Sequence, residues 1–101
     1  MYGTVALLRA KAGMEHQLID FYDRWYADRR PHQEGWQESF LYQSAENPRE
    51  FALVGAYSAR ELFEAGTSGS AAEPWIQAFY DCLEGEFGRV TGDVVRRDSA
   101  G

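Results

Sequence analysis

One stretch of the chain, from Trp36 to Glu64, constrains the fold more than any other. It contains two runs of alternating, strand-like residues, and a short turn joins them. The runs are Phe40-Leu41-Tyr42-Gln43 and Phe51-Ala52-Leu53-Val54, and the turn is Ala45-Glu46-Asn47-Pro48-Arg49. Asn and Pro so close together are typical of a turn between paired strands. The sequence therefore predicts an antiparallel hairpin.

The hairpin leads directly into a predicted helix start. Ser58 is followed three residues later by Glu61, which is the spacing of a capping box, where each side chain bonds the backbone amide of the other residue. Tyr57 and Leu62 flank this cap at the spacing of a hydrophobic staple. The junction between strand and helix is therefore expected to have a defined angle.

The remaining elements follow from changes in hydrophobic period. A strand is predicted at 4–8, followed by a helix that runs from Met14 through Arg29 and Arg30 and stops at Pro31. A second helix is predicted to start after Ser58 and, after an interruption, to start again at a second capping box at 70–73. A last strand is predicted at 87–95. The order is β-α-β-β-α-β, which predicts an α+β, ferredoxin-like antiparallel sheet. We expect one domain over residues 1–97 and a tail at 98–101.

Two helical segments can cover only one face of such a sheet. If Val5, Leu7, Phe40, Tyr42, Ala52 and Val54 face the helices, the uncovered face carries Thr4, Ala6, Leu8, Gln37, Ser39, Leu41, Leu53, Gly55 and Tyr57. That set is apolar for a face in water. We therefore expect it to close on a second copy of the chain around a small-molecule pocket; a partly hydrated sheet face is the alternative.

Charge and composition exclude several classes of partner. The chain has 101 residues, a net charge of −6 and a single cysteine, Cys82. Negative charge disfavours nucleic acid and anionic membranes. A lone cysteine forms no intrachain disulfide, and neither a signal peptide nor a membrane span is predicted, so we expect a cytoplasmic protein. His16 and His32 have no metal-ligand spacing, so no metal site is predicted.

The stretch from Gly35 to Phe63, together with Lys11-Ala12-Gly13, resembles the antibiotic-biosynthesis-monooxygenase-like family. The resemblance covers about residues 2–97 and consists of turns and apolar positions. It implies a homodimeric α/β barrel in which the sheets of two chains close on each other. It also implies activities that range from cofactor-independent oxygenation of aromatic polyketides to heme degradation.

Heme-degrading members of the family have an Asn, a Trp and a His at positions that look like Ala6, Tyr57 and Gly66 here. All three differ, so the resemblance implies neither heme binding nor heme turnover. We therefore expect no cofactor.

A cofactor-free oxygenase needs a dry aromatic substrate, a proton acceptor and donors that stabilise an anion. Tyr57, where the family has its pocket aromatic, is the candidate catalytic residue, although a tyrosine at a strand end is as often a packing residue. The candidate substrate-binding residues are Gln37, Ser39, Gln43, Trp75, Tyr80 and Arg89. Trp75 and Tyr80 fit a helix core equally well, and Arg89 fits a salt bridge at the rim.

The sequence thus favours a cofactor-independent monooxygenase-like protein that acts on a small aromatic or quinone-type substrate. The alternative is a dimer of the same fold that binds a small ligand, or is associated with stress, without catalysis. Oxygen consumption with polyphenol substrates distinguishes the two.

Overall fold

The computed structural model of the chain describes residues 1–28, 31, 33–67 and 74–98. Its elements are β1 (Tyr2–Ala10), α1 (Glu15–Asp28), β2 (Trp36–Gln43), β3 (Glu50–Tyr57), α2 (Arg60–Thr67), α3 (Pro74–Asp81) and β4 (Leu83–Asp93). The predicted α+β fold is confirmed. β1, β2 and β3 extend beyond the apolar runs that predicted them, because the ladder also pairs polar and glycine residues at their ends. The prediction for the last strand, 87–95, was shifted: β4 begins at Leu83 and ends at Asp93, so Val94 and Val95 follow the strand. The predicted capping box at 70–73 and the last turn at 29–30 lie outside the described residues.

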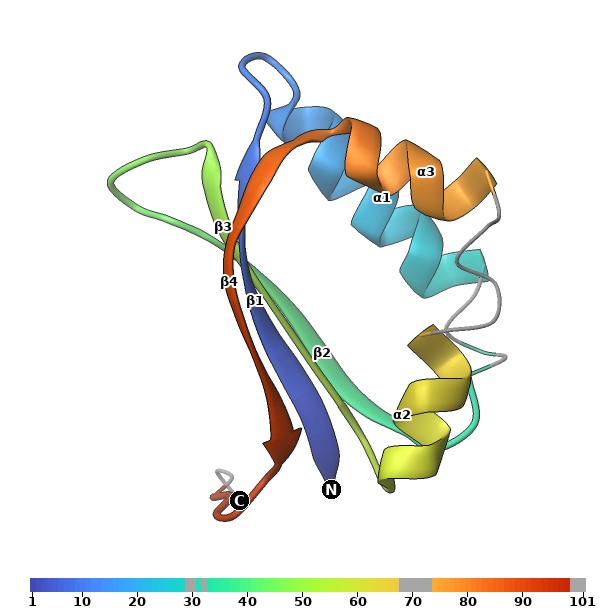
Figure 1. Ribbon diagram of the computed structural model, residues 1–101. Helices are drawn as coiled ribbons and strands as arrows, with labels where there is room; N and C mark the ends of the chain where they lie inside the picture. Colours follow the sequence, from blue (N-terminus) through green and yellow to red (C-terminus); the bar gives the residue numbers. More distant parts are fainter. Residues whose placement is uncertain (29–30, 32, 68–73, 99–101) are drawn as a thin grey trace.

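The four strands form one antiparallel sheet in the order β2-β3-β1-β4. Helices α1, α2 and α3 lie on the same side of this sheet, and the described residues place no helix on the other side (Figure 1). Among the described residues, no helix is long and apolar enough to cross a membrane.

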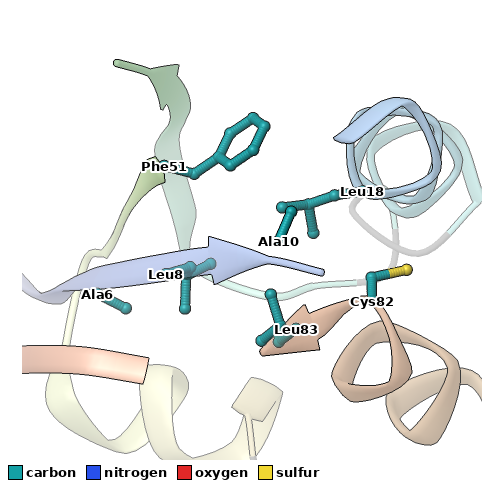
Figure 2. Close-up of a cluster of buried hydrophobic side chains, with 7 residues drawn as sticks. All are labelled: Ala6, Leu8, Ala10, Leu18, Phe51, Cys82 and Leu83. Atoms are coloured by element: carbon teal, nitrogen blue, oxygen red, sulfur yellow. The ribbon is translucent and has the colours of Figure 1, made fainter. Parts of the chain in front are cut away.

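The core lies between the sheet and the helices at one end of the sheet. Leu8 of β1 and Leu18 of α1 are the largest fully buried side chains. They pack with residues from β1, β3 and the junction of α3 and β4, as Figure 2 shows; these are Ala6, Ala10, Phe51, Cys82 and Leu83. Burying a leucine side chain stabilises the fold by about 1.5–3 kcal/mol, so the two leucines anchor α1 on the sheet.

The prediction of which sheet face meets the helices was wrong. Val5 and Leu7 are 40% and 47% exposed, and Phe40 and Tyr42 are 46% and 57% exposed, so these residues lie on the uncovered face. Ala6 and Leu8 are 1% exposed and pack against the helices. Alternation separates the two sets of residues, but both sets are apolar, so the pattern could not decide between the faces.

The junction of loop, strand and helix is held at Gly35. Its φ angle is +79°, which an L residue rarely adopts, and a Cβ there would collide with the side chain of Leu62 in α2. The carbonyl of Gly35 accepts a hydrogen bond of 2.7 Å from the amide of Ser58. Glycine at this position therefore lets the loop before β2 pack against the start of α2.

Candidate functional site

The helix-facing side of the sheet has a polar row between the core at one end and the aromatic residues Tyr2, Tyr57 and Trp36 at the other. This polar row crosses all four strands: Gly55 of β3 pairs with Ser39 of β2 and Thr4 of β1, and Thr4 pairs with Thr91 of β4. The next row toward the core contains Leu41, Leu53, Ala6 and Arg89. Together the two rows form a floor with polar groups at both of its edges.

Hydroxyl groups are paired at the two edges of this floor. The Tyr22 hydroxyl, from α1, donates to Ser39 Oγ over 3.0 Å. At the other edge, Thr4 Oγ1 and Thr91 Oγ1 lie 2.9 Å apart, and Thr4 Oγ1 also donates to the Val90 carbonyl over 3.2 Å. Each pair fixes its hydroxyl oxygens and leaves acceptor capacity for a bound molecule.

The floor is open above Gly55. A Cβ added to this glycine would meet no atom within 4 Å. The flanking residues Thr4 and Ser39 are only partly buried. The space therefore lies between the two hydroxyl pairs, on the side of the sheet that α1 and α2 cover.

Arg89 supplies a positive charge at the β4 edge of the floor. It pairs in register with Ala6, whose side chain faces the helices, so Arg89 belongs to the same face. Ser39 lies on β2, at the opposite edge of the sheet. Three strand spacings of about 4.8 Å place these edges roughly 14 Å apart, which is enough for a flat molecule of two or three fused rings.

Tyr57 does not face the uncovered side of the sheet. Its ring is 4% exposed and packs edge to face on Phe63 of α2, with ring centroids 5.7 Å apart. The hydroxyl donates to Gln33 Oε1 over 2.9 Å. Burial raises the pKa of the Tyr57 phenol, so this hydroxyl stays protonated near neutral pH and is a hydrogen-bond donor rather than a base.

The other predicted site residues are dispersed. Gln37 is exposed at an irregularity in the pairing of β2 with β3, and Gln43 donates to the Pro48 carbonyl within the hairpin over 2.8 Å. Tyr80 is half exposed on α3. Trp75 also lies in α3, but its side chain falls outside what the structure describes. Of the predicted residues, only Ser39 and Arg89 lie on the floor.

Sequence reasoning missed four residues of the site: Thr4, Tyr22, Gly55 and Thr91. Tyr22 lies within the first predicted helix, where no local pattern marks its hydroxyl as part of a site. Gly55 carried a usable signal, because an isolated glycine within a strand often marks a place where another group approaches the backbone. The two threonines come together only through the pairing of the first and last strands, which no local pattern reveals.

The positions that correspond to the heme-degrading residues give no ligand set here. Ala6 is buried in the core and has no donor atom, and Gly66 lies in α2. Among the described residues, no group of three or more His, Cys, Asp or Glu side chains is placed to hold a metal ion.

Comparison with known proteins supplies the fold relationship. No protein-family model and no curated protein matches the sequence. Solved structures match over nearly the whole chain. One of them, a protein from Chloroflexus aurantiacus, is named as an antibiotic biosynthesis monooxygenase. Its sequence is 16% identical to this chain, the TM-score is 0.79, and the match covers 99% of this chain and 98% of that protein. The chain has the antibiotic biosynthesis monooxygenase fold.

Two further structures with this fold come from other bacteria. One, from Nitrosomonas europaea and assigned by name to the same monooxygenases, is 21% identical with a TM-score of 0.76, covering 95% of this chain and 100% of its own. The other is SnoaB from Streptomyces nogalater, a cofactor-independent oxygenase. It is 12% identical to this chain with a TM-score of 0.79, and the match covers 96% of this chain and 94% of SnoaB. At such identities the likeness establishes the monooxygenase fold alone.

Tyr57→Phe tests what the buried hydroxyl does within this fold. Because the ring keeps its contact with Phe63, we expect the fold to persist and the free energy of unfolding to fall by about 0.5–1.5 kcal/mol for one lost hydrogen bond. Chemical denaturation measures this loss. A native tyrosine with a raised pKa also makes stability fall as the pH rises above about 10, where the unfolded chain ionises first, and Tyr57→Phe should reduce that fall. An unchanged pH profile would contradict the assignment.

Proposed function

We propose that the chain is a cofactor-independent monooxygenase that oxidises a small aromatic molecule to a quinone-type product. The observation that carries this proposal is the open space above Gly55, between two hydroxyl pairs and beside Arg89. Likeness in fold to SnoaB, a cofactor-independent oxygenase, supports the reaction class. The single cysteine fits a cytoplasmic location, which belongs to the same proposal.

The proposed reaction needs no external reductant. A hydroxylated aromatic substrate with an oxidisable ring CH2 loses a proton and becomes a resonance-stabilised anion. The anionic carbon forms a bond to O2, and the resulting hydroperoxide loses water to leave a carbonyl group. The net change is CH2 + O2 → C=O + H2O, so the substrate itself supplies all the electrons. The protein must therefore favour the anion, hold the ring and exclude bulk water.

The residues of the floor are suited to these tasks. Arg89 favours the anionic substrate, because a nearby cation lowers the pKa of an acidic group. The hydroxyls of Tyr22 and Ser39, at the other edge, orient oxygen atoms on the far end of the ring system. Leu41 and Leu53, which are partly buried, supply the apolar part of the floor. Tyr57 contributes as a wall residue that holds Gln33, and its protonated hydroxyl takes no proton.

A ligand-binding protein without catalysis is the second candidate. The polar contacts that orient a substrate serve equally well to bind a product or a signal molecule, and the described floor contains no carboxylate or imidazole base. This candidate predicts saturable binding of a polyphenol with no oxygen consumption.

We also propose that the protein is a homodimer that pairs through the uncovered sheet face. Apolar side chains occupy two adjacent rows of that face: Val90, Val5, Val54 and Phe40 in one, and Leu7, Ala52 and Tyr42 in the other. All are exposed except Val54 and Ala52, which are half-buried. A contiguous apolar patch of this kind marks an interface. A second copy presents the same strip, so a symmetric contact buries both strips at once.

Arg89→Gln tests the proposed reaction. We expect oxygen consumption with an anthrone-type substrate to fall about 10- to 100-fold in kcat/KM, because a hydrogen bond to a charged group contributes roughly 1.5–3 kcal/mol. Arg24→Gln, which removes an exposed charge from α1, is the matched control. If wild-type protein binds the substrate but consumes no oxygen, the ligand-binding candidate replaces the enzyme. Equal activity in both variants would remove Arg89 from the site.

A further inference from the structure

The uncovered sheet face is not exposed over its whole length. Val5 and Val90 are 40% and 74% exposed, whereas Ala56, two residues beyond Val54 on the same face of β3, is 6% exposed. Ala56 belongs to the end row of this face, which consists of Gly92, Gly3, Ala56 and Glu38. Gly92 has open space where a Cβ would lie, whereas Ala56 is buried although its own side chain is small.

The segment after β4 reaches from the β4 edge of this row to Glu38, which pairs with Ala56. The amide of Val94 donates to the Met1 carbonyl over 2.9 Å, which extends the pairing with β1 by one residue. Three residues later, Arg97 Nη2 donates to Glu38 Oε2 over 3.2 Å. Since β4 and β2 are the opposite edges of the sheet, the chain crosses the end row between these two contacts. Figure 1 shows this segment on the side of the sheet away from the helices.

We propose that residues 94–98 form a strap that the Arg97–Glu38 ion pair latches across one end of the uncovered face. The latch keeps Val94 and Val95, which are both exposed, at that end and off the apolar strip beside it. A released strap is tethered next to the strip, at a high effective concentration, and can cover apolar surface that a second copy needs. The latch thus favours assembly by holding the strap aside. This role of the latch in assembly rests on the proposed dimer.

Charge holds the strap in place. Arg97 and Glu38 are partly exposed, and exposed ion pairs are weak and screened by salt. Arg96 offers a matched control one residue away, because its side chain bonds only the carbonyl of its neighbour Val95 among the contacts described. Removing either charge of the latch should therefore release the strap, whereas removing the Arg96 charge should not.

Amide hydrogen exchange at Val94 tests the strap without reference to assembly. Because an exposed ion pair contributes at most about 1 kcal/mol, we expect exchange about two- to fivefold faster in Arg97→Gln and in Glu38→Gln than in wild type. Arg96→Gln should exchange at the wild-type rate, and the charge-reversed pair Glu38→Arg with Arg97→Glu should restore it. If the Val94 amide of Arg97→Gln exchanges at the wild-type rate, the Arg97–Glu38 ion pair does not hold the strap and the proposal is wrong.

Sedimentation equilibrium tests its effect on assembly. Arg97→Gln should raise the dimer dissociation constant about two- to fivefold, matching the latch strength. Adding Val95→Ser to Arg97→Gln should reverse this rise, because the released strap then has less apolar surface to place on the strip. If Val95→Ser instead weakens the dimer further, the strap is a contact of the interface and the proposed role is wrong. If the wild-type chain is monomeric, both the proposed dimer and the role of the strap in assembly are wrong. The hydrogen-exchange experiment then tests the latch by itself.

Discussion

Leu7→Asp should convert the proposed dimer into folded monomers, whereas Leu8→Asp should unfold the chain. The two leucines are neighbours on β1 and point to opposite faces of the sheet. Leu7 is 47% exposed on the uncovered face, and Leu8 is 1% exposed in the core. The same substitution therefore places a carboxylate in two different environments, and the comparison separates assembly from folding.

The physical cost is large in both places. An unpaired charge moved out of water costs several kcal/mol. For Leu7→Asp this cost arises only on association, so the dimer dissociation constant should rise more than about 100-fold, equivalent to roughly 3 kcal/mol. For Leu8→Asp it arises on folding and adds to the lost burial of a leucine, which is comparable to the whole stability of a small domain.

Light scattering measures the mass of the assembly, and circular dichroism measures whether the chain is folded. Leu7→Asp should return the mass of one chain with a native far-ultraviolet spectrum, and Leu8→Asp should lose that spectrum. Leu7→Ala is the control for loss of apolar contact without added charge. A wild-type chain that is monomeric at micromolar concentration would contradict the proposed dimer, and a Leu7→Asp variant that still dimerises would place the interface elsewhere.

The sequence predicted the fold well because its strongest signals are local. The turn at Asn47-Pro48 and the helix start after Ser58 depend on residues next to each other in the chain, and both elements are present in the structure. The order of elements then leaves few ways to pair four strands. An uncovered apolar face also follows from the count of elements alone.

The choice of sheet face could not be made in the same way. Phe40 and Leu41, or Leu7 and Leu8, are equally apolar, so alternation gives two sets of residues without saying which set meets the helices. Small alanines at positions 6 and 10 lie under the helices, where they permit close packing. Residue size does not decide the question either, because Ala52 and Ala56 lie on the uncovered face.

Because the helices cover the opposite face from the one expected, the candidate site also lies on a different side of the sheet from its predicted place. Tyr57 and Ser39 were expected at an interface between two sheets and lie instead between sheet and helices. Arg89 shares that layer, and Gln43 pairs with the core residue Phe51, so four of the predicted residues still occur on one face. Tyr57 nonetheless lies beneath α2 with its hydroxyl bonded to Gln33. Hydroxyl pairs such as Thr4 with Thr91 depend on residues 87 positions apart and could not be predicted from local patterns.

Gly55→Val should make the chain more stable and abolish its proposed activity. Gly55 does not have a positive φ angle, and a Cβ there meets no atom within 4 Å, so neither the backbone nor a close contact opposes a side chain that branches at Cβ. Replacing a strand glycine by a β-branched residue gains roughly 0.5–1 kcal/mol, because the unfolded chain loses freedom and strand propensity rises. We expect the melting temperature to rise by a few degrees, about 2–8 °C for a domain of this size.

The added methyl groups occupy the space between Ser39 and Thr4 where the substrate ring is proposed to lie. Substrate is then excluded from contact with the floor, so kcat/KM and ligand affinity should both fall by more than about tenfold, since overpacking a filled site costs 1–3 kcal/mol. Gly85→Val is the matched control. Gly85 is also a glycine of the sheet with open space at its Cβ, but it pairs with Arg9 at the other end of β1.

The combination of results is what makes this substitution decisive. Most site variants lose activity and stability together, so a loss of activity alone can reflect partial unfolding. A variant that melts at a higher temperature and no longer binds or oxidises the substrate leaves only occupation of the site as the cause. Calorimetry and oxygen uptake on the same preparation give both quantities. If Gly55→Val keeps wild-type activity while Arg89→Gln loses it, the substrate lies at the β4 edge of the floor and not above Gly55.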